Sequence, residues 1–563
     1  MVADRTGCRD RPERDDLLPG DLFPDDLLPG DLFPDVLIRE ARLVPVGGVP
    51  APPHSVDIRI RRGLVIEVAP GLRREPSEQV HEAQGRWAIP GLWDQHVHLG
   101  QWSRTRNRLD LTGTACPEDA LARVRAHVAA LPAKDERVVI GWGHRSVLWP
   151  RPVTVAELDA VSGAHPVVLV GGDAHSGWLN TAALALLGGP PATGPLTETD
   201  WFPLFARLEQ LPGQAEATHC GYAGAVAAAA ARGVVGVVDL ELAAGHRDWP
   251  VRFAAGVRDL RVRVGVYPEH LDGVITAGLR SGDALGECGG LVRLGPLKVI
   301  SDGSLTTRSA WCFEPFADAA DPSHDRGAPN LDAPELTALL SRATRHGLSV
   351  AVHAIGDAAI AQAIDCVAVA GARGSIEHAQ MPRSQDITRM ARLGIAASVQ
   401  PAHLLDDRDV AASCWPDRLD RCYPFRSMAT AGVELRLGSD APVSPLDPWL
   451  TIAAAVHRSG DDRPAWNSAE ALTVAEALAA STDGQRTIAP GSRGDVVLLD
   501  ADPLGPTDDR LRPDPAGDAP VRGGTVTRDH VNGEAGDRAG LAAYLLAMPV
   551  AATFVAGRAT HLT

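Results

Sequence analysis

The amino-acid sequence predicts an α/β protein in which a (β/α)8, TIM-like barrel carries a small β-sandwich domain built from both chain ends. Three observations predict this fold class. Apolar strand-like runs alternate with helical patterns from about residue 90 to 486, short alternating segments flank that region on both sides, and 563 residues suffice for one large barrel with an appendage. Such alternation over this length is typical of a parallel sheet closed into a barrel.

Residues 1–34 are expected to form a flexible leader. The stretch is charged and proline-rich, and it contains the tandem repeat "DDLLPGDLFP" at 15–24 and 25–34. Two copies are too few for a solenoid, and the composition favours a disordered segment. The leader lacks the apolar core of a signal peptide, so a cytoplasmic location is expected.

The β-sandwich domain is expected to combine residues 35–90 with residues 487–563. "DVLIREARLVPVGG" and "DIRIRRGLVIEVAP" near the start resemble "GDVVLLDADPL" and "PVAATFVAGRATHLT" near the end: all are short alternating runs split by Gly and Pro. A polar stretch rich in Pro, Gly and Asp, about 503–537, is expected to be a loop insertion in the second part.

The barrel is expected over residues 91–486. The apolar run "RWAIPGLWD" is expected to form a buried strand ahead of the further candidates, and helical patterns such as "APELTALLSRATRHG" lie between many of them. The further strand candidates are "HPVVLVGG", "VVGVVDL", "VRVGVYP", "LVRLGPLKVI", "LSVAVHAIG", "GSIEHAQ", "IAASVQPAH" and "VELRLGSDAP".

Composition excludes several classes of protein. The formal charge of −17 argues against nucleic acid and against anionic membranes as partners. No apolar run reaches the ~18 residues of a membrane-spanning helix. The eight cysteines include no C-x-x-C pair, which favours reduced, buried thiols. A small-molecule substrate is the expected partner, and a homodimer is left open.

Six polar residues fall at or near the carboxyl ends of strand candidates, which meet at one face of a barrel where active sites form. They are His96, His98, Lys298, His353, His378 and Asp440. His96 and His98 are two residues apart, so their side chains point the same way, roughly 6.5–7 Å apart, and can hold one metal ion. Taken singly, each residue has an ordinary explanation: a hydrogen-bonded core histidine, a buried ion pair for Lys298, or a turn cap for Asp440.

Lys298 stands out by composition. Only two of the 54 basic residues are lysines, Lys134 and Lys298, so the remaining 52 are arginines. Lys134 lies in a polar loop, but Lys298 lies in an apolar strand-like run. A lysine retained at that position indicates a role that a guanidinium cannot perform.

These motifs resemble those of the amidohydrolase superfamily. "PGLWDQHVHL", "LGPLKVISDGSL", "VAVHAIGDAAI", "IEHAQ" and "RLGSDAPVSPLDPW" are similar, in order, to its metal motifs. The match is closest to the amidohydrolase-3 branch, which includes N-substituted formamide deformylases, and "VVLVGGDAHSGWLNTAAL" resembles a further segment of that branch. The resemblance covers about residues 35–563.

The resemblance implies roles for individual residues. His96 and His98 would bind the more buried metal, His353 and His378 the second, and Lys298 would bridge both as a carboxylated amine. Asp440 would contact the buried metal and act as acid and base. Asp302 or Glu377 would be hydrogen-bond partners of the ligand histidines. Asp173 and His175 would line the substrate side. Apart from the resemblance, His403 at a strand end and His144 are further substrate-side candidates. Trp142, Trp178 and Trp311 lie near the motif segments and could line an apolar pocket, but core packing is the favoured explanation for them.

The expected chemistry is hydrolysis of a C–N bond in an amide or N-formyl or N-acyl substrate, by attack of hydroxide on one or two divalent metals. Zinc is the expected metal, since imidazole and carboxylate ligands suit it, with Mn, Fe and Ni as alternatives. The same centre also fits hydrolysis of a cyclic amide or an ester, or deamination. A metal-binding homologue without turnover is the other class.

Overall fold

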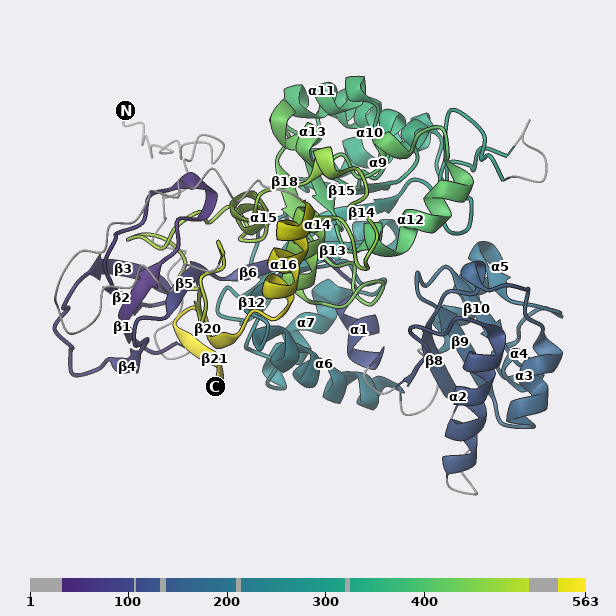
Figure 1. Ribbon diagram of the computed structural model, residues 1–563, viewed down its shortest axis with the longest axis horizontal. Helices are drawn as coiled ribbons and strands as arrows, with labels where there is room; N and C mark the ends of the chain where they lie inside the picture. Colours follow the sequence, from purple (N-terminus) through teal and green to yellow (C-terminus); the bar gives the residue numbers. More distant parts are fainter. Residues whose placement is uncertain (1–32, 106–107, 132–137, 209–213, 319–324, 506–534) are drawn as a thin grey trace, which may run out of the picture.

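The computed structural model describes residues 33–105, 108–131, 138–208, 214–318, 325–505 and 535–563. It confirms the predicted fold class. Three parts lie side by side along the long axis: a β-domain that contains both ends of the described chain, a central barrel, and a separate α/β unit (Figure 1). The predicted leader, apart from Phe33 and Pro34, and the loop around Lys134 lie outside the described residues.

The central barrel is nearly closed and has eight parallel strands in sequence order. The two edge strands meet through the loop after the last strand, because the Asp440 N–H donates to His96 O at 2.7 Å and the His98 N–H donates to Ala441 O at 2.8 Å. The strands are β6 (Leu92–Val97), β12 (Val234–Asp239), β13 (Arg261–Val266), β14 (Val292–Ile300), β15 (Val350–Ala354), β16 (Gly374–His378), β17 (Ala396–Val399) and β18 (Leu435–Leu437).

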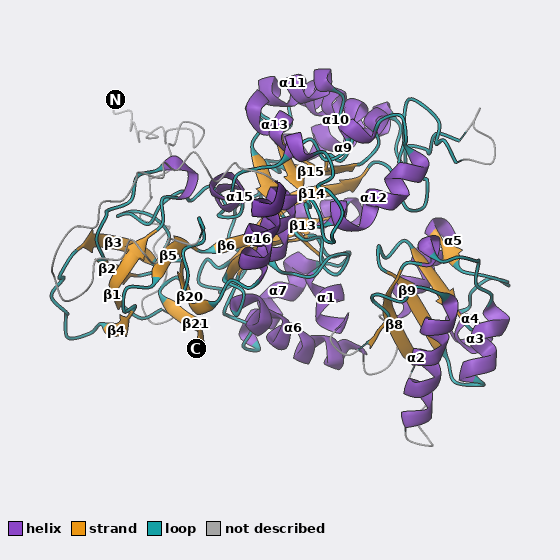
Figure 2. Cartoon of the chain, in the orientation of Figure 1, coloured by secondary structure: helices purple, strands orange, loops and turns teal. Residues whose placement is uncertain are grey.

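Helices surround this barrel (Figure 2). Their starts follow local sequence signals: Asp332 caps one helix by accepting the Glu335 N–H at 2.8 Å, and the Glu335 carboxylate accepts the Asp332 N–H in return. The helices are α1 (Leu99–Thr105), α6 (Gln214–Ala230), α7 (Gly245–Ala254), α8 (Pro268–Thr276), α9 (Ala333–Arg345), α10 (Asp357–Ala370), α11 (Ser384–Leu393), α12 (His403–Cys414), α13 (Phe425–Ala431), α14 (Pro448–His457), α15 (Val474–Ala480) and α16 (Ala535–Leu546).

The two ends of the chain share one sheet. β5 pairs antiparallel with β19, so the strands before the barrel and the strands after it are joined directly. The strands are β1 (Val36–Leu43), β2 (Val56–Arg61), β3 (Leu64–Ala69), β4 (Gln79–Glu82), β5 (Trp87–Pro90), β19 (Val496–Leu499), β20 (Val550–Val555) and β21 (Arg558–Leu562). "RWAIPGLWD" is therefore two strands, β5 in this sheet and β6 in the barrel. The domain boundaries themselves stay a prediction.

Most of the predicted 503–537 insertion lies outside the described residues. Its last residues belong to α16, which packs against α14 of the barrel, and the Tyr544 hydroxyl donates to Asp502 O at 2.8 Å. Within the described ranges, no helix is long and apolar enough to cross a membrane.

A third part, residues 109–208, forms a separate five-stranded sheet with its own helices, here called the inserted unit. The prediction that "HPVVLVGG" is a barrel strand is wrong. This run forms β9, which belongs to the sheet of the inserted unit. Both faces of β9 are buried, in two different apolar clusters, so its continuous apolar run looks like a barrel strand. The elements are β7 (Leu109–Asp110), α2 (Pro117–Ala130), β8 (Val139–His144), α3 (Val155–Ser162), β9 (Val167–Gly171), β10 (Ser176–Leu179), α4 (Thr181–Leu187), β11 (Leu196–Thr197) and α5 (Glu198–Leu208).

Candidate metal and substrate site

The structure brings all six predicted ligand residues together at the carboxyl end of the barrel. They line a cavity of about 330 Å³, here called the barrel-mouth cavity. His98 is half-buried, and the other five side chains belong to residues that are buried. These residues are spread from 96 to 440 in the sequence, but the parallel strands that carry them end at the same side of the barrel. The six residues are His96, His98, Lys298, His353, His378 and Asp440.

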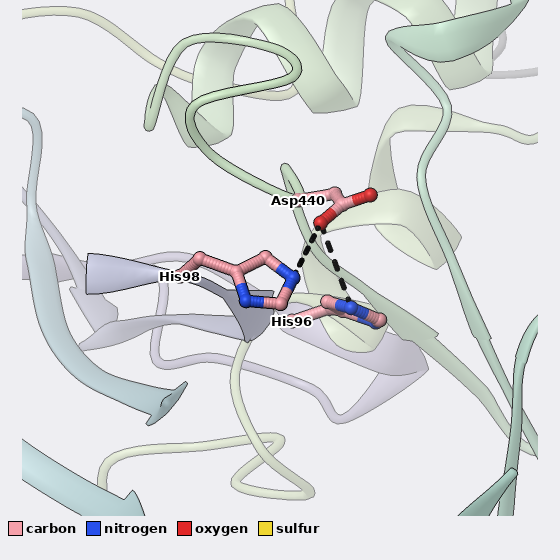
Figure 3. Close-up of side chains that lie close together, drawn as sticks. All are labelled: His96, His98 and Asp440. Atoms are coloured by element: carbon pink, nitrogen blue, oxygen red, sulfur yellow. Dashed lines mark ion pairs between the residues drawn. The ribbon is translucent and has the colours of Figure 1, made fainter. Parts of the chain in front are cut away.

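His96, His98 and Asp440 form one close group (Figure 3). Asp440 Oδ1 lies 3.3 Å from His98 Nε2 and 3.5 Å from His96 Nε2, yet it makes no hydrogen bond. Asp440 has a left-handed φ of 56°, an uncommon conformation for a residue other than glycine that is often found at functional sites. Burial alone would raise the pKa of Asp440, but the imidazoles of His96 and His98 hold it well below its usual range.

Gly438 allows the segment that carries Asp440 to lie close to the backbone of His96. A Cβ atom at this position would lie 2.7 Å from the His96 backbone nitrogen, closer than side chains are found to pack. The Asp94 carboxylate joins the same segments, since it accepts the backbone N–H groups of His96 at 3.1 Å and Ser439 at 3.0 Å. Asp440 is therefore held beside the two histidines by the backbone and by a buried carboxylate.

Lys298 lies on β14 inside the barrel and is 2% exposed. Its Nζ lies 3.3 Å from His96 Nε2, and no described carboxylate lies within the 4.0 Å of an ion pair. The buried ion pair that would explain an ordinary lysine here is thus not found among the described residues. Burial lowers the pKa of Lys298, although Glu377 and Asp440 act in the opposite direction. Lowering the pKa favours the neutral, nucleophilic amine.

His353 and His378 stand on the neighbouring strands β15 and β16, with ring centroids 4.4 Å apart. Burial, followed by the charge of Lys298, lowers the pKa of His353 well below its usual value; burial and His353 do the same for His378. Both rings are therefore neutral, which is the form that binds metal. His403, the first residue of α12, stacks on His378 with ring centroids 6.1 Å apart.

Two buried carboxylates support these histidines. Glu377 accepts a hydrogen bond from His96 Nδ1 at 2.6 Å, which leaves His96 Nε2 to face Lys298 and Asp440. Asp302 accepts the backbone N–H groups of Trp311 at 3.0 Å and Gly356 at 2.9 Å, and its Oδ1 lies 3.5 Å from His353 Nε2. Burial raises the pKa of Asp302 to about 7.

The chemistry of these side chains fits a divalent metal. Ligand atoms of His96, His98 and Asp440 lie within 4.8 Å of one another, and so do those of His378, His403 and Asp440. Several of their polar atoms are buried without a hydrogen-bond partner in the described structure: His98 Nδ1, His378 Nδ1, His403 Nε2 and Asp440 Oδ1. Buried polar atoms are normally satisfied, so this concentration indicates a bound cation.

The inserted unit supplies the opposite wall of the cavity. Asp173 and His175, the two substrate-side candidates that the resemblance implies, both line it. His175 Nδ1 lies 3.0 and 3.2 Å from the two oxygens of Glu198. The Asp173 carboxylate accepts hydrogen bonds from the backbone N–H of His175 at 3.1 Å and from the Thr306 hydroxyl. His403 lines the cavity as well, from the barrel side.

The three tryptophans near the motif segments do not line the barrel-mouth cavity, which agrees with the core-packing explanation. Trp178 is fully buried in the core of the inserted unit, where its Nε1–H donates to Thr154 O at 2.9 Å. Neither Trp142 nor Trp311 is among the described residues that line the barrel-mouth cavity. His144 is also buried away from it, with Nε2 3.1 Å from Leu169 O. The large apolar surface of these side chains is used for packing.

Several cavity residues have no clear signal in the sequence. Arg145 lies between β8 and α3 of the inserted unit, and it forms an ion pair at 2.5 Å with Asp406 of α12. This ion pair connects the inserted unit with the barrel. Asp407 accepts hydrogen bonds from Gln380 at 3.0 Å and from Tyr423 at 2.5 Å. The only sequence indication is negative charge directly after His403 in "PAHLLDDRD".

A nearly closed (β/α)8 barrel with histidines, a lysine and an aspartate at its carboxyl end defines a hydrolase with a candidate site for divalent metal. The chain belongs to the amidohydrolase family, whose model matches residues 79–561. The relatives described next place it in the amidohydrolase-3 branch, as the sequence motifs predicted.

Three relatives are similar over most of their length. Protein LONG AFTER FAR-RED 3 of Arabidopsis thaliana is 28% identical, over 79% of this chain and 84% of its own. Putative amidohydrolase YtcJ of Bacillus subtilis is 27% identical, over 76% and 87%. N-substituted formamide deformylase of Arthrobacter pascens is 24% identical, over 76% and 86%.

A solved structure shares the fold. The crystal structure of an uncharacterized metal-dependent hydrolase from Pyrococcus horikoshii has a TM-score of 0.69 to this chain at 24% sequence identity. The alignment covers 84% of this chain and 98% of that one. The shared region therefore includes more than the barrel.

Proposed function

We propose that this hydrolase cleaves the C–N bond of a small amide, N-formyl or N-acyl substrate. The observation that carries the proposal is the Asp440 carboxylate, which has an unbonded oxygen 3.3–3.5 Å from two imidazoles and lines a cavity large enough for a small molecule. The name of the relative N-substituted formamide deformylase supports the choice of an amide. A small molecule is accordingly the proposed partner.

Zinc is the proposed metal, because neutral imidazoles and a carboxylate are its usual nitrogen and oxygen ligands. His96, His98 and Asp440 would hold one ion, and His353 and His378 would hold a second. A bound divalent ion would supply a Lewis acid that polarises a carbonyl group and lowers the pKa of a water molecule.

Lys298 is proposed to join the two groups of ligands as a carbamate. Its amine adds to the carbon of CO₂ and loses one proton, which leaves a carboxylate at the end of the side chain. Burial lowers the pKa of the amine and so favours the neutral form that this addition requires. The absence of a described ion-pair partner within 4.0 Å supports this role.

Asp440 is proposed to accept the proton of the attacking water. Its depressed pKa keeps the carboxylate ionised, and its unbonded Oδ1 has a lone pair available. Glu377 fixes the ring of His96 through the 2.6 Å hydrogen bond. The inserted unit contributes Asp173 and His175 to the opposite wall of the cavity.

The proposal is tested by substrate profiling of purified, metal-loaded protein against matched panels of N-formyl amides, N-acyl amides, cyclic imides, esters and aminated ring compounds. We expect kcat/KM to be highest for the N-formyl or N-acyl amides and to fall at least ~100-fold in Asp440→Asn, since removal of an acid–base group costs about 10²–10⁴-fold. A clear preference for esters, cyclic imides or ring deamination contradicts the proposed substrate class.

A further inference from the structure

His175 is fixed at one ring nitrogen and unbonded at the other. Its Nδ1–H donates to Glu198, at 3.0 Å from Oε1 and 3.2 Å from Oε2. In the described part of the chain, Nε2 has no hydrogen-bond partner, and the residue lines the barrel-mouth cavity. Phe202 packs edge-on against the ring, with centroids 5.5 Å apart. The ring therefore has one orientation, with Nε2 available to a molecule in the cavity.

Glu198 is itself fixed from the barrel. Oε1 accepts hydrogen bonds from the Thr307 hydroxyl at 2.8 Å and the Ser309 hydroxyl at 3.1 Å, both in the segment after β14. Glu198 has a left-handed φ of 43°, so its backbone is held in a conformation that favours glycine. The Glu198 carboxylate thus connects His175 of the inserted unit with two hydroxyls of the barrel.

We infer that His175 is the proton donor to the departing nitrogen, and that Glu198 is the positioning residue that orients the ring and favours its doubly protonated form. This inference rests on the proposed function, hydrolysis of a C–N bond. It assigns to two groups the acid and base steps that Asp440 would otherwise perform alone.

The chemistry of C–N cleavage explains why a second group is useful. An alkylamine anion is a very poor leaving group, so the nitrogen must gain a proton as the C–N bond breaks. Enzymes often meet such a requirement with two groups whose surroundings drive their pKa values apart. Burial would lower the pKa of His175, but Glu198 and Asp173 raise it, whereas the pKa of Asp440 is held low.

The charged groups around His175 favour its protonated form overall. Asp173 and Glu198 lie on the same unit as His175. Asp440, Asp302 and His353 interact with it from the barrel. A ring that carries a proton on both nitrogens can keep its bond to Glu198 and still donate from Nε2.

The proposed reaction has two proton transfers, one to Asp440 and one from His175. The oxygen of water forms a bond to the carbonyl carbon, and Asp440 takes one proton from that water. The C–N bond then breaks, its electron pair remains on nitrogen, and nitrogen takes the Nε2 proton of His175. The products are a carboxylic acid and an amine. Transfer of the Asp440 proton to His175 restores both residues.

A leaving-group series tests the role of His175 directly. For amides of alkylamines, His175→Gln should lower kcat/KM by about 10²–10⁴-fold, whereas for anilides with strongly electron-withdrawing rings the loss should be at least ~10-fold smaller, because those amines depart with less help from a proton. Glu118→Gln is the matched control, since Glu118 is exposed on the same unit, forms an ion pair with Arg151 and does not line the barrel-mouth cavity. The control should behave as wild type with every substrate.

Glu198→Gln provides a second, milder variant, because glutamine can still accept the Nδ1–H bond but carries no charge. His175 must be protonated to donate, so kcat/KM falls as pH rises through its pKa. Removing the charge of Glu198 lowers that pKa, and the alkaline limb of the pH profile should move to lower pH. The Glu118→Gln profile should not move.

Three outcomes are distinguishable. Equal losses for alkylamides and activated anilides in His175→Gln, together with an unmoved alkaline limb in Glu198→Gln, overturn the role of His175 while the hydrolase activity stands. A wild-type protein that cleaves no amide overturns the proposed function and this inference with it. Unequal losses with a shifted limb support the inference.

Discussion

Removal of the charge on Glu377 is expected to weaken metal binding. Glu377 accepts the His96 Nδ1–H bond at 2.6 Å, and both side chains are almost fully buried. A short, charge-assisted bond of this kind fixes the ring and makes Nε2 a better ligand. Loss of such a partner costs about 10–100-fold in metal affinity, equivalent to about 1.4–2.8 kcal/mol. We therefore expect Glu377→Gln to raise the Kd for the metal by that factor.

The assay is competition between the protein and a chelator of known affinity, at fixed pH, with the free-metal concentration varied. Ser375→Ala is the matched control, since the Ser375 hydroxyl donates to Glu377 without contacting the histidine. It should change the Kd by less than ~10-fold, because a hydrogen bond to the partner is lost but the charge remains. An unchanged Kd in a folded Glu377→Gln variant would refute the reasoning that this carboxylate sets the ligand strength of His96.

Two further predictions concern the bridge and the chain ends. Lys298→Arg should lose the second metal and most turnover. Lys298→Ala should do the same but regain part of both when acetate or formate is added, as measured by metal stoichiometry and initial rates. A fully active Lys298→Arg enzyme would favour a site without the carbamate. Deletion of residues 1–32 should leave the melting temperature nearly unchanged, because this cut keeps the buried Phe33. Deletion of 550–563 removes β20 and β21, which pair with β19 and with each other, and should give insoluble protein; a soluble, active product of that second deletion would count against a sheet shared by both chain ends.

The fold and the clustering of the candidate ligand residues could be predicted from the sequence for physical reasons. Polar residues recur at the carboxyl ends of apolar strand candidates, and six of them do so in this sequence. In a barrel these strand ends meet at one face, so the pattern predicts a functional site there. The composition made Lys298 conspicuous, and the structure places its amine 3.3 Å from His96 without an ion-pair partner in the described chain. Lys298 is thus the clearest case in which composition and geometry agree.

The inserted unit was missed because local pattern does not reveal which sheet a strand joins. β9 is apolar on both faces, as a barrel strand would be, and only the pairing with β8 and β10 shows its true place. Glu198 was missed for a similar reason. It lies 23 residues after His175, in the polar stretch "LTETDW", and its role depends on hydroxyls of Thr307 and Ser309 more than 100 residues away.

The central claim is that the side chains at the carboxyl end of the barrel hold divalent metal for hydrolysis. The most direct test is elemental analysis of purified protein, wild type against a double variant with His96→Ala and His98→Ala, with folding checked by circular dichroism. The account predicts about one to two divalent ions per wild-type chain and a sharp loss in the folded double variant. Equal metal content in the two proteins would contradict it.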